Sequence, residues 1–266
     1  MFCVSQSHVI SCKHETHALL TLVSHISTKE NLMRKIFNAK NLLRFIFGTF
    51  VVSVVFVVIR IISAPTVAPI SNVPVRIKSD YVLMLLQCCV GILAMLIPGF
   101  LIRRVRLSIP TVMLVVYAVF LYCAIYLGEV RNFYFVVPHW DTILHIFSGA
   151  ALGALGFSVI SILNKTESLH LSLEPAFVAL FAFGFAVSLG VIWEIYEFAA
   201  DSILNTNMQK FALESGEQLV GRAALADTMK DLIVDTLGAF VVSVIGYISL
   251  KHEKGWLERF QVESMK

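Results

Sequence analysis

Charged side chains are scarce in this chain. They make up 15% of its 266 residues, whereas 58% of the residues are hydrophobic. The mean hydropathy of +0.81 is far above that of a soluble domain. This balance excludes an ordinary soluble protein and leaves room for one helical membrane domain with short tails. The net charge of +3 is too small to indicate a nucleic-acid partner.

Common signatures of catalysis are also missing. The sequence has no His-Glu-x-x-His pair, no Gly-x-Ser-x-Gly turn and no glycine-rich phosphate loop. Its five cysteines form neither an even set nor a Cys-x-x-Cys pair, so we interpret them as reduced, small hydrophobic residues. These absences leave open whether the protein is an enzyme.

The N-terminal residues differ from the rest of the chain. Residues 1–28 lack a basic-then-apolar signal pattern, and we interpret them as a disordered or dispensable leader. Translation starting at Met33 is an alternative. Residues 29–43 combine apolar and basic side chains, which predicts an interfacial amphipathic helix.

An all-α, polytopic membrane domain of six spans is predicted over residues 44–250, followed by a cytoplasmic tail at 251–266. Each apolar segment is long enough to cross a bilayer. Prolines before several segments predict helix starts, and Pro98-Gly99 predicts the end of the second helix. The expected spans are 44–62, 81–102, 110–128, 141–163, 175–200 and 230–250.

Lysine and arginine predict the orientation. With both termini cytoplasmic, the inner segments carry fourteen basic residues and the outer segments seven. The expected location is therefore the inner (cytoplasmic) membrane of a bacterium, as a multi-pass protein in contact with the lipid bilayer.

The last three spans carry seven carboxylates and one histidine near their predicted outer ends. Because helical residues three or four apart share a face, each set lies on one side of its helix. Carboxylates at this depth are costly in lipid, so they predict a shared, outward-facing polar cavity. The sets are Asp141 and His145; Glu194, Glu197 and Asp201; and Asp227, Asp231 and Asp235.

Carboxylate oxygens with one imidazole suit a divalent cation such as Mg²⁺, Mn²⁺, Ca²⁺ or Zn²⁺. We expect His145, Glu194, Asp235 and Asp141 to be the metal ligands. The alternative is that the carboxylates pair with basic residues of the same side, and Asp201 and Asp227 are the better candidates for this. Those basic residues are Arg131, Lys210, Arg222 and Lys230.

The other roles follow from position. His145 is a ligand or a general base, and Glu197 or Asp231 is the expected proton-transfer partner. Arg222 could clamp a phosphate or carboxylate of a substrate, and Trp193 could form part of the cavity wall. The loop 202–226 is expected to lie over the cavity.

The motifs resemble those of a known family. Asp141-x-x-x-His145-x-x-x-Gly149, Trp193-Glu194-x-x-Glu197-x-x-x-Asp201 and Asp227-x-x-x-Asp231-x-x-x-Asp235-x-x-Gly238 are similar to the YjdF-like bacterial inner-membrane proteins. This resemblance implies no established activity. A more distant similarity is to the VanZ-like family, tied to glycopeptide resistance, although Asp235 stands where that family has asparagine.

Three functions fit these features. The first is cation-dependent hydrolysis or transfer on a lipid-linked or cell-envelope substrate. The second is an ion- or proton-coupled transporter or flippase, weakened by the lack of an inverted repeat between the two halves. The third is a non-catalytic lipid- or antibiotic-binding protein. The oligomeric state does not follow from the sequence.

Overall fold

The computed structural model describes residues 39–66, 75–164, 173–213, 217–252 and 263–264. The predicted interfacial helix at 29–43 and the leader therefore lie largely outside the described residues. The chain divides into two compact units, Met1–Arg44 and Phe45–Lys266. The second unit contains the membrane-spanning domain, apart from the first residues of helix α2.

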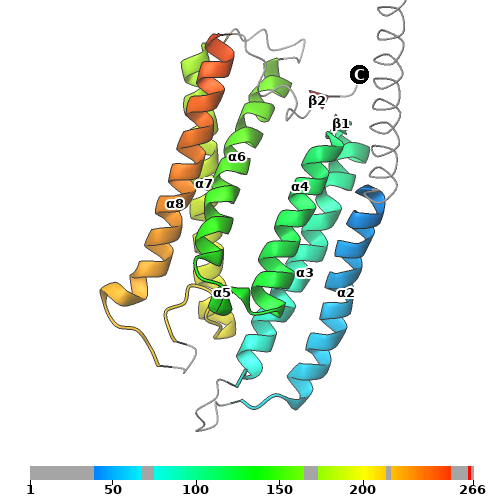
Figure 1. Cartoon of the computed structure of the whole chain (residues 1–266), viewed down its shortest axis with the longest axis vertical. Coiled ribbons are helices and arrows are strands. Elements are labelled where there is room, and N and C mark those ends of the chain that lie inside the picture. The colour runs from blue at the N-terminus through cyan, green and yellow to red at the C-terminus, as the bar shows by residue number, and fades with distance from the viewer. Residues whose placement is uncertain (1–38, 67–74, 165–172, 214–216, 253–262, 265–266) are drawn as a thin grey trace, which may run out of the picture. The chain divides into compact units, whose positions relative to one another are not determined.

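Six helices in the described residues are long and apolar enough to cross a membrane, which confirms the predicted all-α polytopic class (Figure 1). The other described elements are a one-turn helix α5, two π-helical segments and a short antiparallel pair of strands, β1 with β2. The third span consists of α4 and the π-helical segment that follows it, Thr111–Val130 in total. In chain order the elements are α2 (Ala39–Ser63), α3 (Lys78–Phe100), η1 (Leu101–Val105), β1 (Leu107–Ser108), α4 (Thr111–Leu121), η2 (Tyr122–Val130), α5 (Phe133–Val136), α6 (Trp140–Asn164), α7 (Pro175–Leu204), α8 (Arg222–Lys251) and β2 (Glu263–Ser264).

Pro98 does not end the second span, contrary to the sequence prediction. The helix runs through Phe100 and continues as a π-helical turn over Leu101–Val105. A proline lacks the N–H that would bond the carbonyl four residues earlier, here that of Ala94. The Tyr117 hydroxyl of α4 donates to this carbonyl at 3.1 Å instead. This replacement bond lets the helix continue past the proline.

The helices that carry the acidic residues, α6, α7 and α8, pack directly against one another. A buried apolar cluster joins α6 to α7 through Phe157, Ile160, Val178 and Ala182. A Cβ added to Gly246 of α8 would collide with the Phe157 ring, so this glycine is what admits the ring between the helices. The N-terminal part of α6, the C-terminal part of α7 and the N-terminal part of α8 consequently lie at the same end of the bundle (Figure 1).

Candidate functional site

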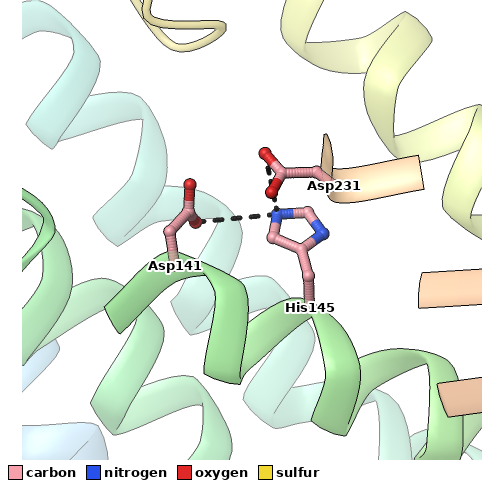
Figure 2. A group of neighbouring side chains, drawn as sticks. All are labelled: Asp141, His145 and Asp231. Carbon is pink, nitrogen blue, oxygen red and sulfur yellow. Dashed lines mark ion pairs between the residues drawn. The ribbon is translucent and has the colours of Figure 1, made fainter. Parts of the chain in front are cut away.

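His145 is the centre of the polar cluster. Its Nδ1 lies 3.0 Å from Asp235 Oδ2, and its Nε2 lies 3.6 Å from Asp141 Oδ1 and 3.8 Å from Asp231 Oδ2. One ligand atom each from Asp141, His145 and Asp231 lies within 4.8 Å of the other two (Figure 2). The imidazole therefore separates one carboxylate on its Nδ1 side from two on its Nε2 side.

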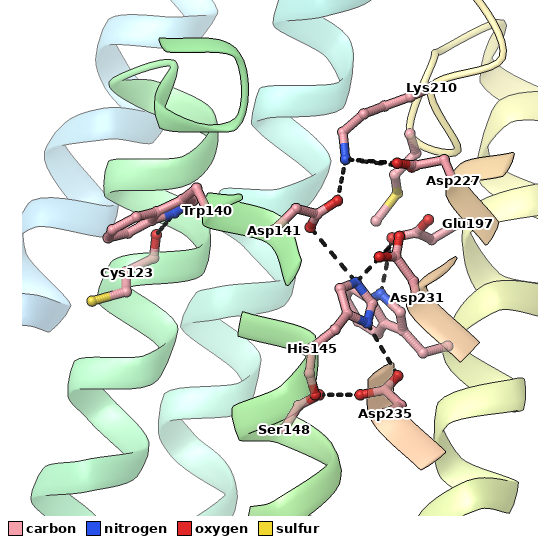
Figure 3. Close-up of polar contacts among 12 residues, drawn as sticks. Cys123, Trp140, Asp141, His145, Ser148, Glu197, Lys210, Asp227, Asp231 and Asp235 are labelled. Carbon is pink, nitrogen blue, oxygen red and sulfur yellow. Dashed lines mark hydrogen bonds and ion pairs between the residues drawn. The ribbon is translucent and has the colours of Figure 1, made fainter. Parts of the chain in front are cut away.

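Asp235 is occupied on both of its oxygens. Oδ2 faces His145 Nδ1, and Oδ1 accepts a hydrogen bond of 2.7 Å from Ser148 Oγ (Figure 3). When the Nδ1 proton is on His145, it is donated to Asp235 and the Nε2 lone pair points to Asp141 and Asp231. Metal-binding histidines are held in this way, by a carboxylate that accepts the other N–H.

Glycines allow α6 and α8 to approach closely enough for this contact. A Cβ on Gly149 would overlap the backbone carbonyl of Asp235, and a Cβ on Gly238 would overlap that of Ile146. On α7, a Cβ on Gly190 would lie 3.2 Å from Asp235 Oδ2. Gly149 and Gly238 thus allow the backbones of α6 and α8 to touch, and Gly190 leaves space on α7 for the Asp235 carboxylate.

Glu194 and Asp231 are two buried carboxylates of the site. Glu194 is 5% exposed and Asp231 1% exposed. Three of their oxygens have no hydrogen bond of normal geometry among the described residues: both oxygens of Glu194 and Oδ1 of Asp231. The Thr228 hydroxyl is a neighbouring donor to Glu194. Buried polar atoms without partners are costly, which points to a bound group or proton.

Glu197 is held on its own helix. Trp193 Nε1, one turn earlier on α7, donates to Glu197 Oε1 at 2.9 Å. Glu197 is also buried, at 7% exposed. The indole therefore fixes the carboxylate as well as forming part of the cavity wall.

Asp201 organises the loop that follows α7. Its Oδ1 accepts from the Thr206 hydroxyl and the Met208 amide, both at 2.7 Å, and its Oδ2 accepts from the Gln209 amide at 2.9 Å. The carboxylate thus accepts hydrogen bonds from loop donors that would otherwise be buried without a partner. Asp201 lies in the last turn of α7, and its carboxylate is bound to the loop that follows this helix.

Lys210 reaches from this loop into the site. Its ammonium contacts Asp141 directly and lies 3.3 Å from Asp227 Oδ2 (Figure 3). It also lies over the Tyr134 ring, 5.4 Å from the centroid. Burial alone would lower the pKa of Lys210, but the two carboxylates outweigh it and raise the pKa above the usual 10.5. Burial, reinforced by Asp141, raises the pKa of Tyr134 well above its usual value.

Most of the residues singled out from the sequence meet here, but Arg222 does not. It is exposed in the first turn of α8, and it is not among the residues that line the cavity. Among the described residues, Lys210 is the cation that pairs with Asp141 and Asp227. Ser148 was not singled out, although its position three residues after His145 on α6 is a usable signal.

These features define a class of protein: a multi-pass membrane protein with a buried acidic and histidine cluster at one end of its bundle. Residues 42–252 match the family described as "Predicted membrane protein (DUF2238)", and the chain belongs to this family. That is the family of the YjdF-like proteins, so this part of the expected resemblance holds. None of the reported matches supports the likeness to VanZ-like proteins.

A curated relative was also found. It is an uncharacterized protein of Thermotoga maritima that is 33% identical over 122 residues, or 46% of this chain. The chain spans about half the length of this relative, 54%. No solved structure matches the chain. The comparisons therefore establish the family but no activity.

Proposed function

We propose that this protein binds a divalent cation between Asp141, His145 and Asp231. With this cation it would hydrolyse, or transfer a group on, a lipid-linked or cell-envelope substrate. The observation that carries the proposal is the approach of three ligand atoms from two helices to within 4.8 Å. Among the described residues, Oδ1 of Asp231 has no hydrogen-bond partner, and the carboxylate of Glu194 is buried with Thr228 as its neighbouring donor. Both are available as acceptors for a bound cation.

The two sides of the imidazole support a division of roles. Asp235 is saturated by Ser148 and His145 Nδ1, so it orients the ring. Asp231 faces Nε2 and has a free oxygen, which suits a ligand. This assignment makes Asp231 a ligand, where the sequence suggested a proton-transfer partner. It makes Asp235 the residue that orients His145, where the sequence suggested a ligand. Glu194 would complete the site as a further oxygen ligand.

The chemistry follows from the cation. A divalent ion in this position would lower the pKa of a bound water and neutralise an anionic substrate group. Glu197, which accepts a hydrogen bond from Trp193, would accept the proton of that water. Lys210 would supply a second positive charge on the substrate side, where the sequence suggested Arg222. Lysine and arginine counts favour the outer side of the inner membrane for this end.

A transporter or flippase that relays protons would need polar groups along the whole membrane. Ionisable residues among the described cavity-lining positions gather at the end that holds His145, on α3, α6, α7, α8, the end of the third span and the adjoining loops. The rest of that wall is apolar apart from hydroxyl groups such as that of Ser158. The enzyme proposal therefore fits the distribution of charge better.

Cation binding tests the proposal directly. Mn²⁺ is titrated into the purified full chain in detergent, and free Mn²⁺ is followed by electron paramagnetic resonance. The wild type should bind Mn²⁺, and an Asp141→Asn, Asp231→Asn double variant should bind more than about 100-fold more weakly, since loss of a supporting residue alone costs 10- to 100-fold. Glu174→Gln, an exposed carboxylate before α7, is the matched control.

Either of two results would overturn the proposal. One is a wild type that takes up no Mn²⁺, Mg²⁺, Ca²⁺ or Zn²⁺. The other is a double variant with the same affinity as Glu174→Gln. If the cation binds but no envelope lipid or glycolipid is turned over, the non-catalytic binding function replaces the enzyme.

A further inference from the structure

A large cavity adjoins the cation site. Its volume is about 1620 Å³, and helices α3, α4, α6 and α7 line it. Pockets for small molecules usually measure about 300–1,000 Å³, so this space exceeds what a compact polar substrate would fill. We therefore expect a ligand that is large enough to extend well beyond the cation.

The cavity follows one face of α6 along most of that helix. The lining positions recur every three or four residues, from Asp141 and His145 through Ser148 and Leu155 to Ile162. At 1.5 Å per residue, the distance from Asp141 to Ile162 is about 31 Å, close to the hydrocarbon thickness of a bilayer. The space therefore extends through the depth of the membrane instead of ending at the site.

The chemistry of the wall changes along this length. Near His145 the lining includes the charged side chains of Arg76, Lys210 and Glu197. Toward the other end the described lining residues are apolar, among them Leu107 and Met113. A peptide or sugar in that apolar part would leave its polar groups unpaired, whereas a hydrocarbon chain has none.

We propose that this cavity holds the hydrocarbon chain of a long-chain lipid phosphate whose headgroup meets the cation. This inference rests on the proposed function, because carboxylates outnumber Lys210 and Arg76 at the polar end and a phosphate needs the divalent ion there. With the ion present, the polar end offers positive charge at the headgroup and the apolar wall receives the chain. Small side chains on α6, Ala151 and Ala154, leave room for the chain.

The test uses hexadecyl phosphate as the probe, with butyl phosphate as its short-chain counterpart. Purified full chain in detergent micelles is loaded with Mn²⁺, and bound lipid is measured by native mass spectrometry. Hexadecyl phosphate should bind, and butyl phosphate in excess should not displace it. Leu155→Trp fills the cavity wall and should weaken binding by at least tenfold. Leu180→Trp, the same change at a residue 68% exposed on α7, should leave binding unchanged.

Mn²⁺ affinity is measured on the same samples without lipid, so the two proposals fail separately. A protein that binds Mn²⁺ but not hexadecyl phosphate overturns the lipid inference alone, and one that binds neither overturns both. Equal lipid binding by Leu155→Trp and Leu180→Trp, or full competition by butyl phosphate, also overturns the inference. A dimeric wild type that Leu155→Trp makes monomeric would show that a second copy fills the cavity, again overturning it.

Discussion

The two parts of the bundle differ in how their helices meet. Helices α6, α7 and α8 touch through glycines such as Gly149 and Gly238, with their polar side chains buried between them. Helices α3 and α4, in contrast, face α6 and α7 across the cavity. The core between α2 and α3 is apolar, with Val57 and Met84 at its centre.

This difference has a physical basis. A cluster of carboxylates in a membrane must have each group held in place, because a misplaced charge costs several kcal/mol. Rigid helices in close contact provide that precision. An apolar wall has no such requirement, since lipid tails or a ligand chain can fill what side chains leave open. The tightly packed helices α6, α7 and α8 thus hold the polar site, and the cavity beside α3 and α4 leaves space for a ligand chain.

The largest expected effect compares two phenylalanines. Phe157 is 3% exposed and packed between α6, α7 and α8, whereas Phe120 lies on the cavity wall against Phe147. Phe157→Ala should destabilise the protein by about 3–5 kcal/mol, and Phe120→Ala by about 1 kcal/mol, because only the first leaves a void in a filled core. Unfolding by SDS titration measures both. Equal losses would mean that the two parts are packed alike.

A second prediction concerns how the tight part holds His145. Asp235→Asn keeps the size of the side chain but removes the charge that orients the imidazole, and should weaken Mn²⁺ binding by about 10- to 100-fold. Asp231→Asn should weaken it more, since Asp231 is the proposed ligand. The same Mn²⁺ titration compares them. The reverse order would make Asp235 a direct ligand and Asp231 a supporting residue.

The sequence was sufficient to predict the six spans because hydropathy and proline positions mark them. It placed the last span at 230–250, but α8 begins at Arg222. Asp227 and Lys230 lower the hydropathy of that first part, yet the Asp227 carboxylate is neutralised by Lys210 in the fold. A prediction from composition alone does not detect the Lys210–Asp227 ion pair, so it begins this span too late.

The site was predictable in outline only. Helical spacing places Asp231 and Asp235 on one side of α8, but the rotation of α8 against α6 decides which meets Nδ1 of His145 and which meets Nε2. The role of Lys210 depends on the loop, whose course is set by the contacts of Asp201 with Thr206 and Gln209. These are tertiary contacts without a local sequence pattern.

The smallest expected effect concerns that loop, which covers the tight part. Lys210→Met removes the contacts to Asp141 and Asp227, so amide hydrogen exchange at 205–213 should become faster while the helices stay protected. Lys251→Met removes exposed contacts to Tyr247 at the other end of α8, so it is the control and should leave this loop unchanged. Unchanged exchange in Lys210→Met would show that Asp201 alone holds the loop.

The pH dependence of this contact has a definite sign. The pKa of Lys210 is raised in the folded protein above its usual 10.5, so its stabilising contribution is complete below about pH 10.5 and is lost as the pH rises further. The difference in loop exchange between wild type and Lys210→Met should therefore be constant from neutral pH to about pH 10, once the intrinsic rate is divided out. A difference that already disappears between neutral pH and about pH 10, where the Lys210 ammonium keeps its charge, would mean that the ammonium is not what closes the loop over the site.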